Sequence, residues 1–306
     1  MTQSKPKVIF VCGPTASGKS SVAIQIAKSF AGEIINADSR QFYKELNIGT
    51  AKPNPAEQES ITHHLIDCAS IAEPWDVGRF VKEARLKISE LSQNKILPIV
   101  TGGTGMYLRS LRFGLAEIPA VSAQTQKKLE ARLKEKSLQE LYQDLQACDP
   151  KQAQRIEQSD TQRILRALSV YEETGKPLSS FWNNDWESQS VYDDFAFILD
   201  WPRDELYQRI NERVDLMLQS GLQKEVQDLL QNNQDRALLE KTIGYQEWFK
   251  LGFDDPQKVA EEIKKNTRQF AKRQLTWFRK EKSLHWILPN QQQKLIDTID
   301  RFLTEG

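Results

Sequence analysis

Gly13-Pro14-Thr15-Ala16-Ser17-Gly18-Lys19-Ser20 is the most informative stretch of this sequence. It follows the pattern G-x-x-x-x-G-K-[ST] of a phosphate-binding loop (P-loop). A strand-like run over 7–12 precedes it and a helical pattern from about Ser20 to Phe30 follows, which is the context that the motif requires. In such a loop the backbone N–H groups point at phosphate oxygens, Lys19 adds a point charge and the Ser20 hydroxyl can bind Mg²⁺. The alternative is an accidental glycine-rich turn.

The segments on either side of the loop predict the fold class. Glu33–Ala37 and Ile96–Val100 are further strand-like runs, and Arg79–Gln93 has helical periodicity. Strands that alternate with helices are typical of a parallel sheet with helices on both faces. We therefore expect an α/β fold: a P-loop core with a parallel sheet flanked by helices.

The amino-acid composition of the sequence changes near residue 120. From there to about residue 192 the chain is rich in glutamine and charge and has no strong strand pattern. One helix is expected over about 160–174, with Gly175 and Pro177 as stop signals. We expect 1–119 to be the first part of the catalytic core, 120–192 an inserted all-helical domain, and 193–306 the second part of the core. In that last part, Phe195–Leu199 and Leu284–Leu288 are expected strands.

Composition excludes several classes of protein. Hydrophobic residues make up 39% and charged residues 27%, and 42 basic residues balance 42 acidic ones. The apolar runs are too short to cross a bilayer, the first residues are polar, and the three cysteines lie far apart. We expect a cytoplasmic protein with no membrane contact, no disulfide framework and no evident protein partner.

Two further residues follow expected strands. Asp38 comes after the second strand and Thr104 after the third. In an open parallel sheet ligands lie beyond the carboxyl ends of strands, so Asp38, Thr104 and the P-loop could face one pocket. Nucleotide-hydrolysing P-loop proteins usually carry a metal-supporting acid at a strand end, and Ile96–Val100 lacks one. Asp38 could also be a helix N-cap.

The second half of the chain offers two sets of basic residues. Arg209 and Arg213 share a helix face and could bind a phosphoryl group as a cationic clamp, or could form a solvated face with Asp204, Glu205 or Glu212. Near 261–280, apolar residues fall on one side of the expected helix, namely Ile263, Phe270, Trp277 and Phe278. Basic residues fall on the opposite side: Lys265, Arg268, Lys272 and Arg279. With the adjoining Arg273, this stripe fits an RNA backbone, although it could be only a solvated surface.

Taken in order, these blocks resemble the bacterial tRNA dimethylallyltransferase family. The resemblance runs from about residue 7 to 288. It rests on the P-loop and on the blocks 38–43 (DSRQFY), 49–53 (GTAKP), 63–67 (HHLID), 102–105 (GGTG) and 267–277 (TRQFAKRQLTW).

The resemblance implies a reaction without ATP. The P-loop would hold dimethylallyl diphosphate with Mg²⁺, and the acceptor would be N6 of the adenine on the 3′ side of the tRNA anticodon, flipped into a channel. Asp38 would be the base that contacts N6, and Thr104 would lie near the bridging oxygen of the diphosphate. Ser39, Arg40 and Gln41 would face the flipped base and its neighbours. Two segments match tRNA-contacting parts of the family: Gln162, Arg163, Ile164, Leu165 and Arg166, and Lys241, Thr242, Gly244, Tyr245 and Gln246.

Two other functions compete with this interpretation. An adenylate dimethylallyltransferase would use a free nucleotide, for which the helical insertion and the basic stripe are unnecessary. An RNA-binding P-loop NTPase would turn over ATP and would need the strand-end acid that is missing after Ile96–Val100.

Overall fold

The structure is a computed structural model that describes residues 5–73, 75–116, 118–182, 189–232 and 236–305. The chain forms two compact units. One unit comprises Met1–Gly114 and Ser190–Gly306, and the other is Leu115–Gln189. The inserted unit thus begins at Leu115, where the sequence led us to expect residue 120, and ends at Gln189, where we expected 192.

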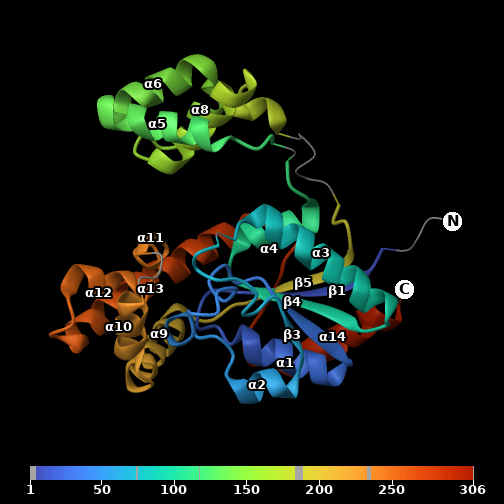
Figure 1. Cartoon of the computed structure of the whole chain (residues 1–306). Coiled ribbons are helices and arrows are strands. Elements are labelled where there is room, and N and C mark those ends of the chain that lie inside the picture. Colours follow the sequence, from blue (N-terminus) through green and yellow to red (C-terminus); the bar gives the residue numbers. More distant parts are fainter. Residues whose placement is uncertain (1–4, 74, 117, 183–188, 233–235, 306) are drawn as a thin grey trace. The chain divides into compact units, whose positions relative to one another are not determined.

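A six-stranded sheet forms the centre of the larger unit (Figure 1). Its strand order is β3-β2-β4-β1-β5-β6, and every neighbouring pair is parallel. The strands are β1 (Lys7–Cys12), β2 (Gly32–Asn36), β3 (His63–His64), β4 (Leu97–Gly102), β5 (Asp193–Leu199) and β6 (His285–Ile287). The predicted α/β class is confirmed, and β3 is the one strand of this sheet that the sequence did not suggest.

Alternation along the strands builds a core on each face of the sheet. In β1, Phe10 contributes to one apolar cluster together with residues of α3 (Val77–Gln93) and α4 (Gly105–Phe113). Ile9 and Val11 contribute to the opposite cluster, with α1 (Lys19–Ser29) and α14 (Gln292–Thr304). Successive side chains of a strand point to opposite faces, so both faces of the sheet need a helical cover. Figure 1 shows α3 and α4 on one side and α1 and α14 on the other.

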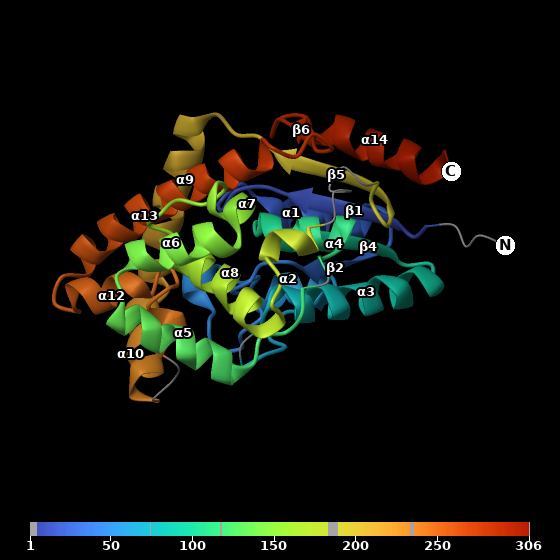
Figure 2. The ribbon, with the colours of Figure 1, turned by 90° about the horizontal axis from the view of Figure 1, so that it is seen from above.

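A group of helices between β5 and β6 in the chain lies beyond the carboxyl ends of the strands (Figures 1 and 2). They are α9 (Arg203–Gln219), α10 (Leu222–Gln231), α11 (Arg236–Leu239), α12 (Gln246–Leu251) and α13 (Pro256–Phe278). A loop with a short 3₁₀ turn, η1 (Ile48–Thr50), and helix α2 (Pro55–Ser60) lie between β2 and β3 in the chain. The strand ends, this loop and α9 and α13 surround the site described below.

The inserted unit is helical, with a core of its own. Its elements are α5 (Ala123–Glu135), α6 (Leu138–Cys148), α7 (Pro150–Ala153), α8 (Thr161–Thr174) and η2 (Leu178–Phe181). Leucine and isoleucine side chains of α5, α6 and α8 pack together in this core. The Asp149 carboxylate, 1% exposed, accepts hydrogen bonds from the backbone N–H groups of Gln152 and Ser179, which ties α7 to η2.

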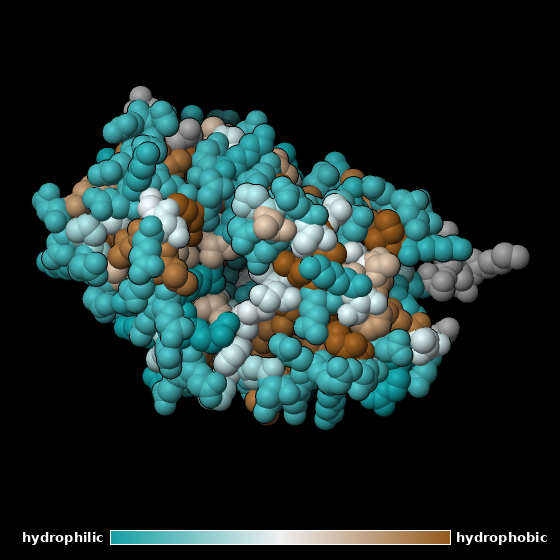
Figure 3. Space-filling view, turned by 90° about the horizontal axis from the view of Figure 1, so that it is seen from below, coloured by the Kyte–Doolittle hydropathy of each residue, from teal (hydrophilic) through white to brown (hydrophobic). Residues whose placement is uncertain are grey.

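The surface is predominantly polar on the side shown in Figure 3, with smaller apolar patches between the polar side chains. Among the residues that the structure describes, no helix combines the length and the apolar character that a membrane span requires.

Candidate functional site

The P-loop joins β1 to α1, as its sequence context predicted. Gly18 adopts a left-handed conformation with φ 87° immediately before α1, which a residue with a side chain rarely adopts. Lys19 is the first residue of the helix, and its ammonium group donates to the carbonyl oxygen of Pro14 at 2.7 Å. The lysine is therefore folded back over the loop, beside the amino end of a helix, where an anion is favoured.

Arg209 and Arg213 of α9 reach the same loop. The Arg209 Nε donates to the carbonyl oxygen of Ala16 at 2.9 Å, and its guanidinium lies 4.2 Å from the ring of Trp201. Arg213 donates to the hydroxyl of Thr15 at 3.3 Å and to the carbonyl oxygen of Thr50 at 3.4 Å. Neither arginine forms an ion pair with a carboxylate within the described ranges, so the solvated-face alternative does not describe them.

These three cations are partly buried, and none of them forms an ion pair within the described ranges. Burial is the main cause that lowers the pKa of Lys19 to about 8; Asp38 opposes this shift and the charge of Arg213 adds to it. Burial also lowers the pKa of Arg213. A buried cation that holds only neutral acceptors costs free energy until an anion arrives. Lys19, Arg209 and Arg213, termed here the cavity cations, therefore present positive charge that no ion pair within the described ranges neutralises.

The cavity cations line a cavity of about 380 Å³, termed the P-loop cavity. Its walls come from the P-loop, the ends of β2 and β4, the η1 loop and the facing sides of α9 and α13. Lining residues include Thr15, Ala16, Gly18, Lys19, Ser20, Asn36, Asp38, Gln41, Thr50, Thr101, Arg209, Arg213, Phe270 and Gln274.

A second cavity of about 380 Å³ adjoins the first and is termed the adjoining cavity. Its lining includes Ser39, Arg40, Thr104, Lys241, Thr242, Gly244, Gln246 and Arg273. Five residues line both cavities and are termed the shared wall: Thr15, Asp38, Thr50, Arg213 and Phe270. A molecule in one cavity and a molecule in the other would meet at this wall.

Asp38 is held at the shared wall by a turn. Its Oδ1 accepts the backbone N–H of Arg40 at 2.9 Å, and its own N–H donates to Oδ1 of Asn36 at 3.0 Å. The residues after Asp38 form turns and no helix, so Asp38 is not a helix N-cap. Its carboxylate instead closes an Asx turn with the N–H of Arg40. This geometry fixes the carboxyl group at the boundary of the two cavities.

Thr104 follows the end of β4 and contacts Ser39, the residue after Asp38. Its hydroxyl donates to Oγ of Ser39 and accepts the Ser39 N–H, both at 3.4 Å. Ser39, Arg40 and Thr104 line the adjoining cavity, whereas Gln41, 9% exposed, lines the P-loop cavity. The Gln41 amide donates to the carbonyl oxygens of Thr50 and Ala51, so its side chain supports the η1 loop.

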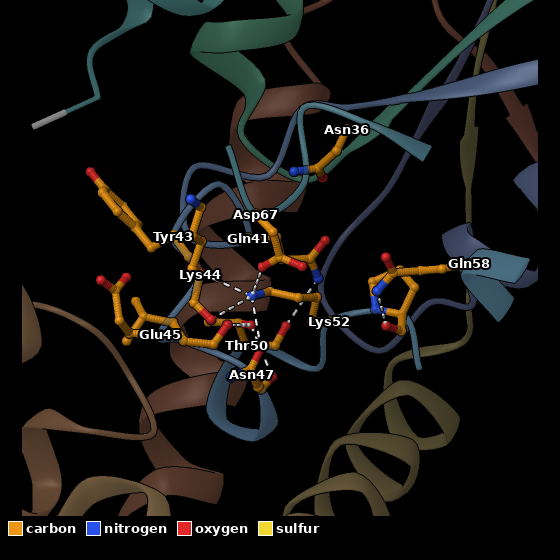
Figure 4. A network of polar contacts seen from close by, with 12 residues as sticks. Asn36, Gln41, Tyr43, Lys44, Glu45, Asn47, Thr50, Lys52, Gln58 and Asp67 are labelled. Carbon is orange, nitrogen blue, oxygen red and sulfur yellow. Dashed lines mark hydrogen bonds and ion pairs between the residues drawn. The ribbon is translucent and has the colours of Figure 1, made fainter. Parts of the chain in front are cut away.

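The η1 loop is anchored from two sides. Figure 4 shows the Lys52 ammonium among the carboxylate of Asp67, Oδ1 of Asn47 and the backbone of Tyr43 and Lys44, all of which accept its hydrogen bonds. From α10, the Glu225 carboxylate accepts the N–H groups of Ile48 and Gly49 at 2.9 and 3.1 Å. These anchors hold Thr50 in the shared wall.

The segment Lys241–Gln246 divides into a supporting part and a cavity-facing part. Tyr245 is 0% exposed, and its hydroxyl donates to Glu225 at 2.7 Å. Its ring packs so closely on Gly49 that a Cβ there would lie 2.5 Å from a ring carbon. Lys241 and Gln246 are the more accessible lining residues of this segment.

The basic stripe on α13 is partly paired within the protein. Lys265 pairs with Glu262, and Arg268 donates to the amide oxygen of Asn211. Lys272 and Arg279 are exposed, and Arg273 lines the adjoining cavity. On the other side of α13, Ile263 and Phe278 are core residues as predicted, each 1% exposed, whereas Phe270 is 37% exposed and faces the cavities. The prediction that Phe270 packs in the core is therefore wrong.

The segment Gln162–Arg166 lies on α8 of the inserted unit. Ile164 is 0% exposed and belongs to the core of that unit. Leu165 is partly buried, while Gln162, Arg163 and Arg166 are exposed. The polar members of the segment thus form its outer face.

Two residues that support the P-loop and the η1 loop were given no role from the sequence. Gln274 of α13, 7% exposed, accepts the N–H of Thr15 at 2.9 Å and donates to the carbonyl oxygen of Gly103 at 2.9 Å. It thereby links the P-loop to the end of β4. A polar residue four positions after Phe270, on the inward face of an amphipathic helix, was the available signal. Glu225 carried no comparable signal, because it lies on an ordinary helix far from the loop in sequence.

Comparisons with known proteins agree on one family. The model of the IPP transferase family matches residues 41–281. The "tRNA dimethylallyltransferase 1" of Trichlorobacter lovleyi is 44% identical over 92% of this chain and 94% of that protein. The tRNA dimethylallyltransferase of Salinibacter ruber is 41% identical over 91% and 87%. Among solved structures, the tRNA isopentenylpyrophosphate transferase of Staphylococcus epidermidis is 35% identical, with a TM-score of 0.71 and coverage of 98% of this chain and 99% of that one. A eukaryotic dimethylallyltransferase described as acting on tRNA is 29% identical, with a TM-score of 0.83 and coverage of 98% and 80%.

Proposed function

The chain belongs to the IPP transferase family, and we propose that it transfers the dimethylallyl group of dimethylallyl diphosphate to an adenine of tRNA. It is a prenyltransferase. One observation carries the proposal: three partly buried cations that form no ion pair within the described ranges line one cavity, and a carboxyl group, Asp38, lies where that cavity meets a second one. Diphosphate and base would then approach Asp38 from opposite sides.

The donor occupies the P-loop cavity in this proposal. Backbone N–H groups of residues 13–20 and the cavity cations bind the diphosphate, and Arg209 and Arg213 exchange part of their bonds to loop carbonyls for bonds to phosphate oxygens. Lys19 neutralises the charge that develops on the leaving diphosphate. The pairing is favourable because charge-assisted hydrogen bonds to phosphate are stronger than bonds to neutral carbonyl groups.

The acceptor occupies the adjoining cavity. The atom that reacts is N6 of the adenine on the 3′ side of the anticodon, and the base must leave its stack to reach a cavity. Ser39, Arg40, Lys241 and Gln246 supply polar contacts around it. Thr104, whose hydroxyl is bound to Ser39, also lines the adjoining cavity. We propose, from the family resemblance, that it contacts the bridging oxygen of the donor where the donor reaches the shared wall.

The chemical step requires a base that acts late. The adenine amino group holds its proton too strongly for a carboxylate to remove it beforehand. As N6 attacks C1 of the dimethylallyl group, the C1–O bond breaks, its electron pair leaves with the diphosphate, and the nitrogen becomes cationic. Asp38 then accepts the N6 proton, a contribution of about 10²–10⁴ in rate.

A divalent metal fits the side chains of the P-loop cavity. Ser20, Asn36, Asp38 and Thr101 offer oxygen atoms there, and the described residues contain no cluster of three or more acidic, histidine or cysteine side chains that would form a complete metal cage. Mg²⁺ prefers one or two protein oxygens together with substrate phosphates and water. We propose that Ser20 holds Mg²⁺, which when bound would neutralise diphosphate charge.

The tRNA would contact several separate surfaces. In the larger unit these are the basic stripe and Arg273, and in the inserted unit the exposed residues Gln162, Arg163 and Arg166. Phosphate contacts of this kind position an RNA, and contacts to a flipped base select it. We propose on this basis that the inserted unit takes part in tRNA recognition.

The test is direct. The protein is incubated with unmodified tRNA, Mg²⁺ and dimethylallyl diphosphate, and the nucleosides are analysed by mass spectrometry for a prenylated adenosine. Free AMP replaces tRNA in a parallel reaction, and ATP turnover is measured with and without tRNA. Product on AMP alone would favour an adenylate dimethylallyltransferase, and tRNA-stimulated ATP hydrolysis would favour an NTPase.

A further inference from the structure

Phe270 has an unusual position for a large apolar side chain. It lies on α13, is 37% exposed, and lines both the P-loop cavity and the adjoining cavity. Within the described part of the chain it is the only aromatic residue that lines either cavity. A ligand that covers the exposed ring removes its apolar surface from water, which favours binding.

The position of Phe270 in the shared wall indicates which part of the donor it would contact. Its other four members are Thr15, Asp38, Thr50 and Arg213, and all of them are polar. If the diphosphate lies on one side of this wall and the base on the other, the carbon that changes partners must lie between them. The five-carbon chain attached to that carbon is apolar, and Phe270 is the only shared residue that offers it an apolar surface.

We propose that Phe270 is a substrate-contacting residue, against which the dimethylallyl chain packs during transfer, and that its ring limits the length of the donor chain. This inference rests on the proposed function. The neighbouring Arg273, whose guanidinium lies 5.7 Å from the ring centroid, helps to hold the ring in place.

An aromatic ring at this position would also stabilise the positive charge that develops during the transfer. While the C1–O bond breaks and the N6–C1 bond forms, the allyl carbons carry part of a positive charge. The face of an aromatic ring attracts a cation that water does not screen. The electron pair still leaves with the diphosphate and the proton still passes from N6 to Asp38, so Phe270 changes the barrier and takes no part in the bond changes.

The experiment compares Phe270→Tyr, Phe270→Leu and Phe270→Ala with the unaltered protein. Single-turnover rates are measured with dimethylallyl diphosphate and with geranyl diphosphate, which carries a longer chain, and tRNA affinity is measured separately. Trp286→Leu is the matched control, because Trp286 is 36% exposed and lines neither cavity.

The tyrosine variant should keep the dimethylallyl rate. The leucine variant should lose about tenfold, the order expected for one cation–π contact. The alanine variant should raise the ratio of geranyl to dimethylallyl transfer by at least about tenfold, as expected when an apolar pocket gains room for added carbons. The control should change neither rate.

Two results would overturn the inference. One is an unchanged chain-length preference in Phe270→Ala together with an unchanged rate in Phe270→Leu. The other is a loss confined to tRNA affinity, which would mean that the ring stacks on the base. Failure of the unaltered protein to prenylate tRNA would instead contradict the proposed function, so the two failures are distinguishable.

Discussion

The cavity cations and the basic stripe of α13 have opposite environments. Lys19, Arg209 and Arg213 are bound to carbonyl and hydroxyl oxygens of the P-loop and Thr50, without a carboxylate partner in the described ranges. On α13, Lys265 pairs with Glu262, and the neighbouring Lys264 pairs with Asp215 and Glu261. Similar residue types thus occur with and without internal compensation.

The difference separates two ways of using positive charge. An exposed, paired lysine contributes little to stability and little to binding, because it exchanges one partner for another. A buried cation without an anion is costly in the free protein and gains most when an anion arrives. The cavity cations should therefore dominate donor binding, while each member of the stripe should contribute a small, salt-dependent part of tRNA binding.

The largest effect is expected from Asp38, the carboxylate beside the cavity cations. Asp38→Asn keeps an oxygen for the N–H of Arg40, so the turn is retained, but the basicity is lost. We expect the single-turnover rate to fall by about 10²–10⁴, since the chemical step itself is slowed. Binding of tRNA should change much less. A single-turnover rate close to that of the unaltered protein would reduce Asp38 to a positioning group.

Lys19→Ala removes one cavity cation and should lower kcat/KM by about 10²–10³, the range for loss of one group that stabilises developing negative charge. Ser20→Ala should also impair the reaction through weaker metal binding. Lys28→Ala is the matched control, because Lys28 is exposed on the same helix α1 and lines neither cavity. Steady-state kinetics with varied dimethylallyl diphosphate measure all three variants. Equal losses in Lys19→Ala and Lys28→Ala would point to a general effect on the helix.

The sequence predicted the cavity cations better than the parts that support them. The P-loop is a local motif, so its strand, turn and helix follow from adjacent residues, and Asp38 and Thr104 follow from the rule that ligands lie at strand ends. Arg209 and Arg213 were predicted as a pair at helical spacing, and the structure shows that they contact the P-loop. Their role as a phosphate clamp stays a prediction.

The sequence did not predict contacts between segments that lie far apart along the chain. Glu225 anchors residues 48 and 49 from 177 and 176 positions away, and Gln274 reaches Thr15 across 259. Nothing in a local pattern marks such pairs. For the same reason helical periodicity assigned Phe270 to the core: the apolar side of α13 faces the core at Ile263 and Phe278 but a cavity at Phe270.

The lowered pKa of Lys19 predicts a pH dependence of donor binding. In the free protein the amine is protonated below about pH 8 and neutral above it. A bound diphosphate favours the protonated form, so binding above pH 8 must take up a proton. Affinity for a non-reactive donor analogue should therefore fall by up to about tenfold per pH unit above that value and be nearly constant below it.

The control for this pH dependence is Lys19→Arg. Arginine keeps its charge over the whole range, so the fall above pH 8 should disappear in this variant. Calorimetric titrations in buffers of different ionisation enthalpy would count the protons taken up. Zero uptake at pH 9 in the unaltered protein would contradict the assignment of the diphosphate to Lys19.

The smallest effects are expected from the stripe, and pairing within the protein should rank them. Lys272 is exposed and has no side-chain partner among the described residues, whereas Lys265 must leave Glu262 before it can bind a phosphate. Each phosphate contact changes the slope of log affinity against log salt by at most about one unit. We therefore expect Lys272→Ala to reduce the salt slope of tRNA binding by more than Lys265→Ala, with donor affinity unchanged in both. Lys264→Ala is the control: this lysine is paired with Asp215 and Glu261, which raise its pKa, and its loss should leave the slope unaltered. Filter-binding titrations over a series of salt concentrations measure all three slopes. Equal slopes in the three variants and the unaltered protein would mean that the stripe is only a solvated surface. The larger part of tRNA recognition would then have to lie in the cavity-facing residues and the inserted unit.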